Sequence, residues 1–283
     1  MGLYGAYDTY MSPLVRDWPI LLPMVAVYGA VQVTAQWIYP KVFGTAFQKL
    51  ARDDQNNVIV RTVSVFNGLL MVGSAVCFVT NLRDHGYVLD TDVYREIPYY
   101  RFFRVAIVAY FVWDIFVCFA YKWEAQWKVH AFASLVGAYL LSFPYSDQYG
   151  SYFTGMFELS NVPFHISSII RTLRTTAFSS LATICDVVFA FMFLIIRVVG
   201  GSVVTFRWLQ LMYKLLMDTR SDDKVVVHDE ASIIVSMVLL SIIQSLQYVW
   251  LFEIMKQGYR RFVVADDSNA DDQVSVSKRK KKE

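Results

Sequence analysis

Four polar residues that can carry acid–base chemistry stand inside long apolar runs of this sequence. Asp114 lies in AYFVWDIF, His130 in KVHAFASLVGAYLL, and Glu158 and His165 lie in SYFTGMFELSNVPFHISSII. Carboxylates and imidazoles are among the side chains that most often transfer protons in enzymes. A charged side chain at membrane depth costs roughly 2.5 kcal/mol or more, and it usually faces a protein interior or a wet cavity. These residues are therefore candidates for an interior functional site.

Glu158 begins a further pattern, because Asn161 and His165 follow it at the i+3 and i+7 positions. Residues at this spacing share one face of a continuous helix. Pro163 lies between them and predicts a broken or short helix. A carboxylate and an imidazole within reach form an acid–base pair or a neutral hydrogen bond that satisfies both groups in a dry interior. The sequence leaves both interpretations open.

Asp114, His130 and Arg197 each allow two interpretations. Asp114 is either a chemical group or a buried carboxylate that is hydrogen-bonded to a neighbouring helix. His130 is either a general base or a satisfied hydrogen-bond partner. Arg197 lies eleven residues after Asp186, which is close to three helical turns and too far for the two to pair. Arg197 then either extends to the lipid headgroups or binds an anionic lipid phosphate.

The elements that carry these residues are predicted to be transmembrane helices. Hydrophobic residues make up 56% of the chain and charged residues only 18%, unlike an average soluble domain. Several apolar stretches are long enough to cross a hydrocarbon core of about 30 Å. The sequence therefore predicts an all-α integral membrane protein with seven transmembrane helices. The predicted spans are 18–38, 62–80, 105–121, 129–145, 148–170, 175–196 and 232–252. The amphipathic stretch 203–217 is predicted to lie on the membrane surface.

Lysine and arginine residues predict the orientation of these spans. The connections after the first, third and fifth spans are basic, as expected of cytosolic loops, so the C-terminus is predicted to be cytosolic. The tail from residue 263 is too poor in apolar residues to fold. Lys280 and Lys281 fit a dilysine retrieval signal for the endoplasmic reticulum, and a basic cluster on anionic lipid is the alternative. The Golgi, plasma and mitochondrial membranes are the alternative locations.

Several classes of protein find no support in the sequence. Cys77, Cys118 and Cys185 are odd in number and lack metal-ligand spacing, so neither a disulfide framework nor a metal site is predicted. The sequence contains no phosphate loop, nucleophile elbow or zinc-binding HExxH helix. The net charge of +2 gives no indication of a nucleic-acid partner. No cofactor is expected.

The order of four segments resembles the TLC-domain family. These segments are YFVWDIF, KVHAFASLVGAYLL, FELSNVPF and FMFLIIRVVGG, and the resemblance covers roughly residues 56 to 260. The family includes ceramide synthases, translocon-associated membrane proteins, an endoplasmic-reticulum cargo receptor and small lipid-homeostasis proteins. The more specific parts are the segment around Arg197 and the element formed by Glu158, Leu159, Ser160 and Pro163.

The resemblance implies a fold and three parts of the chain. Residues 1–57 would hold an N-terminal segment with the first transmembrane helix, and 58–262 a TLC domain of six transmembrane helices around a lipid-accessible cavity. Residues 263–283 would form a disordered cytosolic tail. The family's acidic position matches Glu158, which would point into the cavity. An arginine in the context of Arg197 recurs in the family, so the resemblance favours an inward-facing Arg197. Ceramide synthases carry two adjacent histidines where this chain has only His130, and many relatives carry a histidine where it has Asn67. The chain therefore resembles the small lipid-homeostasis proteins more than the ceramide synthases.

The resemblance also implies three functions. The first is binding of an acyl or sphingoid lipid in the cavity, with a role in membrane lipid homeostasis and without firm catalytic residues. The second is acyl transfer from acyl-CoA, with His130 as general base oriented by Glu158. The third is a cargo receptor or accessory subunit with membrane protein partners or a homodimer. The predicted cavity residues are Asp114, His130, Glu158, Asn161, His165 and Arg197.

Overall fold

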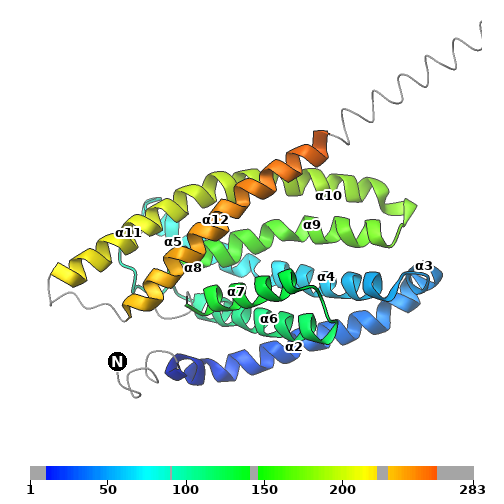
Figure 1. Ribbon diagram of the computed structural model, residues 1–283, viewed down its shortest axis with the longest axis horizontal. Helices are drawn as coiled ribbons and strands as arrows, with labels where there is room; N and C mark the ends of the chain where they lie inside the picture. Colours follow the sequence, from blue (N-terminus) through cyan, green and yellow to red (C-terminus); the bar gives the residue numbers. More distant parts are fainter. Residues whose placement is uncertain (1–10, 90, 141–145, 222–228, 260–283) are drawn as a thin grey trace, which may run out of the picture.

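The computed structural model describes residues 11–89, 91–140, 146–221 and 229–259, apart from the side chain of Gln126. The regular structure of these described residues is helical, with no strand among them. The predicted tail, including Lys280 and Lys281, lies outside the described residues, so the retrieval signal stays a prediction. Figure 1 shows the helices as a bundle of roughly aligned rods, with α12 crossing in front.

The helices follow one another with short connections. The first half of the chain forms α2 (Ser12–Val42), α3 (Gly44–Gln48), α4 (Arg52–Leu70), α5 (Val72–Asp84), α6 (Tyr100–Ala120) and α7 (Ala125–Leu140). The second half forms α8 (Asp147–Ser151), η2 (Tyr152–Met156), α9 (Phe157–Thr172), η3 (Thr176–Phe178), α10 (Ser179–Met192), η4 (Phe193–Gly200), α11 (Gly201–Ser221) and α12 (Glu230–Tyr259).

Five helical stretches of the described chain are long and apolar enough to cross a membrane. Helices suit this environment because every backbone polar group in lipid must be satisfied within the protein. The prediction of an all-α membrane protein is confirmed. Helix α7 and the stretch α8–α9 occupy two further predicted spans without being among the five, so the count of seven transmembrane helices stays a prediction. The five stretches are Ser12–Val42, Arg52–Asp84, Tyr100–Ala120, Thr176–Ser221 and Glu230–Tyr259.

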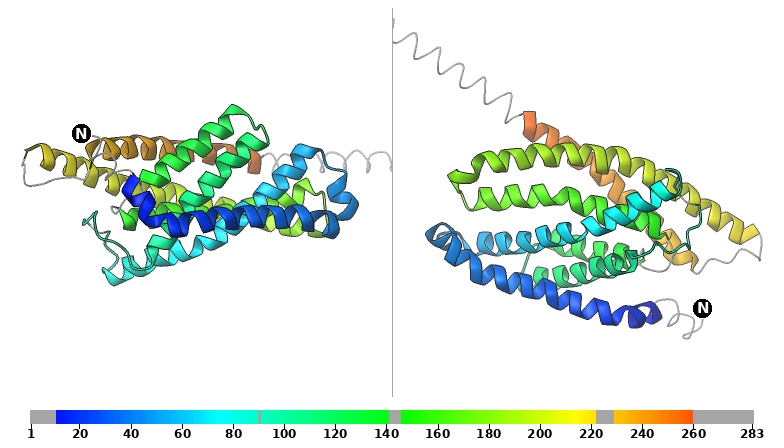
Figure 2. Two further views of the ribbon diagram at one scale, coloured as in Figure 1. Left: turned by 90° about the horizontal axis from the view of Figure 1, so that it is seen from below. Right: turned by 180° about the vertical axis from the view of Figure 1, so that it is seen from behind.

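The helices pack side by side in an order that is visible from behind in Figure 2. Helix α9 lies between α4 and α10, and α2 packs on both α4 and α6. Helix α7 packs on the other side of α6, and α12 crosses η4 and α11 and reaches α7. One apolar cluster forms around Trp208 and Met212, and a second around Tyr28 and Trp113. The contact between α4 and α9 carries the polar residues described below.

Helix α9 corrects the prediction of a break at Pro163. The α-helix runs continuously through Pro163, and the irregular geometry lies earlier, in the π-helix η2. Neighbouring helices allow a proline inside a membrane helix because they compensate for the missing backbone hydrogen bond. Gly155 in η2 permits a close approach of α5, since an added Cβ would lie only 2.3 Å from the backbone nitrogen of Ala75.

The amphipathic stretch 203–217 also differs from its prediction. It is not a separate surface element, because α11 continues directly from η4. Its regularly spaced residues Val204, Trp208 and Met212 are buried in the apolar cluster, and the indole nitrogen of Trp208 donates to Ser146 Oγ at 2.9 Å. The apolar face of this helix packs against protein, which produces the same sequence pattern as a membrane-surface helix.

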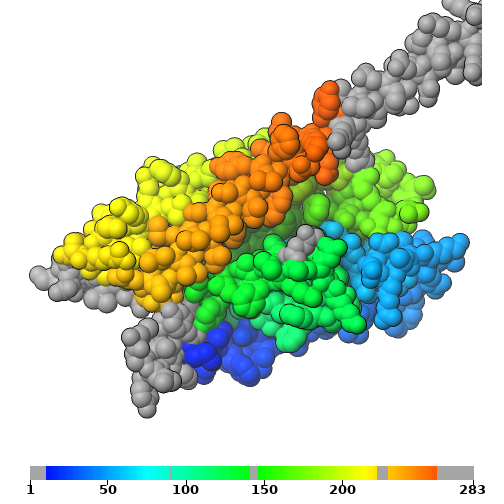
Figure 3. Space-filling view, viewed as in Figure 1, coloured from blue at the N-terminus to red at the C-terminus, as the bar shows by residue number. Residues whose placement is uncertain are grey.

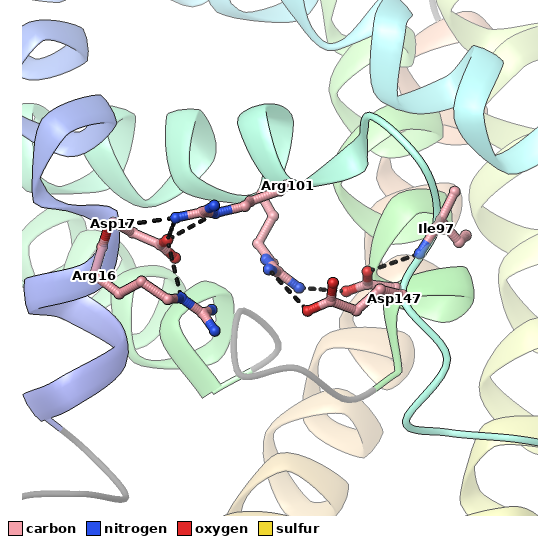
Figure 4. A network of polar contacts seen from close by, with 7 residues as sticks. Arg16, Asp17, Ile97, Arg101 and Asp147 are labelled. Atoms are coloured by element: carbon pink, nitrogen blue, oxygen red, sulfur yellow. Dashed lines mark hydrogen bonds and ion pairs between the residues drawn. The ribbon is translucent and has the colours of Figure 1, made fainter.

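One end of the bundle is fastened by ion pairs (Figure 4). Arg104 Nη1 of α6 donates to Asp147 Oδ1 of α8 at 2.7 Å, and these two side chains are only 1% and 2% exposed. The second oxygen of Asp147 accepts from the backbone nitrogen of Ile97 at 3.0 Å. Arg101 of α6 pairs with Asp17 of α2 at 2.6 Å. These contacts fix α2, α6, α8 and the loop before α6 relative to one another.

Candidate functional site

The space-filling view shows a hollow between α12 and α7 (Figure 3). Its deepest visible part has the green colour of α9. Because α9 is continuous, Glu158, Asn161 and His165 fall on one face of it. All three keep some accessible surface although neighbouring helices surround them. We call this hollow the recess and consider the polar groups around α9 as the candidate site.

Arg197 is directed into the protein and is held there by acceptors of α9 and α12. Its guanidinium donates to Ser160 Oγ at 2.8 Å, to the carbonyl oxygen of Phe157 at 2.7 Å and to Asn161 Oδ1 at 2.9 Å. It also donates to Gln247 Oε1 at 3.4 Å. The residue is only 7% exposed. Arg197 therefore neither extends to the headgroups nor presents a free guanidinium for a phosphate, and it faces inward as the family resemblance implies.

The position of Arg197 also separates it from Asp186. Asp186 of α10 instead bonds to Arg171 and Ser167 of α9. Between the two residues the helix changes to the π-helix η4, in which each turn holds more residues than an α-turn. This change of pitch alters the face on which Arg197 lies relative to Asp186. The face on which Arg197 lies therefore cannot be worked out by counting residues along a regular α-helix.

Glu158 belongs to a hydrogen-bonded chain that joins three helices. Its Oε2 atom accepts from Asn67 Nδ2 of α4 at 3.0 Å, and Asn67 Oδ1 accepts from the hydroxyl of Tyr28 of α2 at 2.9 Å. Tyr28 and Asn67 are both fully buried. Gly68 lets the backbones of α4 and α9 approach here, since an added Cβ would lie 2.9 Å from the carbonyl oxygen of Glu158. The amide of Asn67 therefore orients the carboxylate.

Asp114 supplies a second carboxylate from α6. It is half-buried and close enough to Glu158 for the two to interact electrostatically. The part of the chain that the structure describes offers Asp114 no hydrogen-bond or ion-pair partner. The nearby Tyr110 hydroxyl instead bonds to Ser64 at 2.9 Å. The sequence interpretation of Asp114 as a carboxylate bonded to a neighbouring helix is thus not seen, and its oxygens remain available to a bound molecule.

The two histidines occupy different surroundings. His130 on α7 is exposed and interacts electrostatically with Arg197, but none of the described residues forms a hydrogen bond with its ring. His165 on α9 lies 3.3 Å from Arg61 through its Nδ1 atom. Neither histidine is hydrogen-bonded to Glu158 within the described parts of the chain. The predicted acid–base pairing of Glu158 with His165, and its orientation of His130, are therefore not seen in this structure.

The structure adds partners that sequence reasoning did not assign to the site. Ser160 and Gln247 accept from Arg197, Tyr28 bonds to the Asn67 that orients Glu158, and Arg61 joins His165. The sequence could have indicated Gln247 as a site residue, because it is an amide in an otherwise apolar helix and polar side chains in a membrane helix need partners. Among the described residues, no group of three or more His, Cys, Asp or Glu side chains could hold a metal ion.

The fold and this interior define a multi-helix membrane protein with a polar recess between its helices. A model of the TLC domain, the family of TRAM, LAG1 and CLN8, matches residues 57–256. The chain therefore belongs to the TLC-domain family, as the order of its motifs predicted. No curated protein sequence matches the chain. The match does not distinguish the small lipid-homeostasis proteins from the ceramide synthases.

Proposed function

We propose that this protein binds a membrane lipid in the recess and contributes to membrane lipid homeostasis, as a protein of the endoplasmic-reticulum membrane. The observation that carries the proposal is a set of polar side chains that keep accessible surface inside the helix bundle. Asp114, Glu158 and His130 all have hydrogen-bonding capacity that the described residues do not use fully. Such groups are expensive at membrane depth and are usually functional.

The lipid would enter sideways between α7 and α12. Exposed apolar residues, including Phe132 on α7 and Ile242 on α12, would contact its acyl or sphingoid chain. The polar head would reach Asp114 and Glu158, which accept hydrogen bonds from hydroxyl or amine groups. Arg197 would act through its neighbours, because its guanidinium donates to Ser160 and Asn161 and keeps these two side chains in position.

The arrangement also supports a second candidate, acyl transfer from acyl-CoA. The specific observation is the exposed imidazole of His130, which has no hydrogen-bond partner among the described residues. A neutral imidazole of this kind can accept a proton from an attacking amine or hydroxyl. Glu158 would not orient the imidazole in this arrangement. His130 would therefore act alone or through a contact formed when substrate binds.

Native mass spectrometry of the protein purified in mild detergent tests the proposal. The wild type and Glu158→Gln are compared with Glu253→Gln, which makes the same change at an exposed position of α12. We expect a defined lipid on the wild type and on Glu253→Gln, with reduced occupancy on Glu158→Gln. Absence of lipid from all variants would contradict lipid binding and favour the role of cargo receptor or accessory subunit. Acyl-CoA turnover that is lost in His130→Ala would favour the transferase.

A further inference from the structure

The arginines within the helices of this protein differ in how their charge is compensated. Arg104 pairs with the buried Asp147, and Arg171 pairs with Asp186. Arg197 has four protein acceptors and lies close enough to Glu158 for electrostatic interaction. Arg61 is the exception among these four, because no carboxylate of the described residues pairs with it. A charge inside a helix bundle ordinarily requires such a partner.

Arg61 and His165 together present hydrogen-bond donors that lack acceptors. Arg61 Nε donates to Asn57 Oδ1 at 2.9 Å, and Arg61 Nη1 lies 3.3 Å from His165 Nδ1. A guanidinium only donates, so Nδ1 must accept and the proton of the neutral imidazole lies on Nε2. Three of the five guanidinium N–H groups and the Nε2–H group then have no acceptor among the described residues. Four donors around a positive charge are suited to an anion.

The location of this pair indicates an anion that is attached to a lipid. Arg61 lies nine residues after Arg52, the first residue of α4, which places it about 13 Å along the helix from that end. Its guanidinium lies over the aromatic ring of Phe164, 5.2 Å from the ring centre. His165 shares the accessible face of α9 with Glu158. A lipid bound beside α9 can bring its phosphate or carboxylate to this pair while its chains stay in the apolar surroundings.

We propose that Arg61 and His165 bind the anionic group, a phosphate ester or carboxylate, of the lipid that occupies the recess. The inference rests on the proposed lipid binding and makes it more specific. It divides the polar groups around α9 into a basic part at Arg61 and His165 and an acidic part at Asp114 and Glu158. The acidic part accepts hydroxyl or amine donors of the same lipid. An anionic lipid with hydrogen-bond donors on its head or backbone therefore fits the recess better than an uncharged one.

Thermal unfolding of the delipidated protein in detergent, during titration with defined lipids, tests this assignment. Dioctanoyl phosphatidic acid is compared with dioctanoylglycerol, which has the same chains without the phosphate, and with inorganic phosphate alone. We expect phosphatidic acid to bind the wild type more tightly than dioctanoylglycerol does. Arg61→Gln should lower the affinity for phosphatidic acid about tenfold or more, because charge-assisted hydrogen bonds are lost. Its affinity for dioctanoylglycerol should stay unchanged.

Matched variants separate the site from a general charge effect. Arg207→Gln removes an exposed arginine of α11 and should leave both affinities unchanged. Arg61→Lys keeps the positive charge with fewer donors and should bind phosphatidic acid with intermediate affinity. His165→Phe keeps a ring of similar shape without the Nε2–H donor and should weaken phosphatidic acid binding selectively. If Arg61→Gln does not fold, the Arg61→Lys and His165→Phe variants decide the matter.

Each other outcome has a distinct meaning. Equal binding of phosphatidic acid by the wild type, Arg61→Lys and His165→Phe would overturn the anion site. Binding of dioctanoylglycerol in that experiment would still support the proposed lipid binding. Stabilisation by neither lipid would overturn both proposals. An Arg61-dependent stabilisation by inorganic phosphate as large as that by phosphatidic acid would show that the anion is soluble, which would overturn its assignment to a lipid.

Discussion

The two polar regions of the bundle use the same residue types in opposite ways. At the fastened end, Arg104 and Asp147 are almost completely buried and bond to each other, and Asp147 also binds the backbone of Ile97. Around α9, Arg61 and Asp114 keep accessible surface and have no oppositely charged partner among the described residues. Charges that are paired inside a protein hold it together. Charges that remain unmatched beside an accessible space are suited to binding another molecule.

This difference indicates where substitutions should affect stability and where they should affect binding. A buried ion pair becomes costly when one partner is removed, because the other charge remains in a medium of low polarity. When a residue without a charged protein partner is replaced, no other charge loses its partner. The following predictions test this contrast, beginning with the largest expected effect on stability.

Asp147→Asn should destabilise the protein most. The substitution removes the near, buried counter-ion of Arg104 and leaves only the exposed Glu96 at 4.0 Å. Loss of one partner of a buried pair costs about 3–5 kcal/mol. Thermal unfolding in detergent measures the effect. Arg101→Gln is the control, because the Arg101 side chain of the pair with Asp17 is 49% exposed and an exposed pair contributes about 1 kcal/mol or less. Equal effects of the two variants would show that burial of the ion pair is not what fastens this end.

Gly68→Ala should have an intermediate effect at the contact between α4 and α9. The added Cβ would lie 2.5 Å from Val162 Cγ2 and 2.9 Å from the carbonyl oxygen of Glu158, so α4 and α9 must separate. Such overpacking costs typically about 1–3 kcal/mol. Gly137→Ala is the matched control on α7, where an added Cβ meets no atom within 4 Å. We expect loss of thermal stability and of lipid occupancy in Gly68→Ala only. A fully stable Gly68→Ala protein would contradict the close contact of α4 and α9.

His130→Ala should have the smallest effect on stability. The imidazole is exposed and has no hydrogen-bond partner in the described part of the chain, and substitutions of this kind usually change stability by about 0.5 kcal/mol or less. The unfolding temperature should therefore match that of the wild type. A large loss of stability would mean that His130 has a structural partner. His130 would then belong with the residues that hold the bundle together and not with those that are suited to binding.

Much of the architecture could be predicted from the sequence. Long apolar runs indicated a helical membrane protein, and the order of motifs around Asp114, His130, Glu158 and Arg197 indicated the TLC-domain family, which the match over residues 57–256 confirms. The spacing of Glu158, Asn161 and His165 indicated a common face. Local irregularities were predicted less well, because propensities describe one residue at a time. Pro163 stays within an α-helix that neighbouring helices support, and the π-helix η4 lies in a segment without a proline.

The sequence by itself determined which residues would lie in a membrane and which polar residues would be costly there. Only the tertiary structure decided the partner of each polar residue. Arg197 found four acceptors on α9 and α12, Glu158 found Asn67, and Arg61 lies beside a histidine instead of a carboxylate. The physical reason is that hydropathy is a property of each segment, whereas a hydrogen bond between helices depends on their packing, rotation and pitch. The folded chain therefore decides whether a polar residue stabilises the bundle or remains available to bind another molecule.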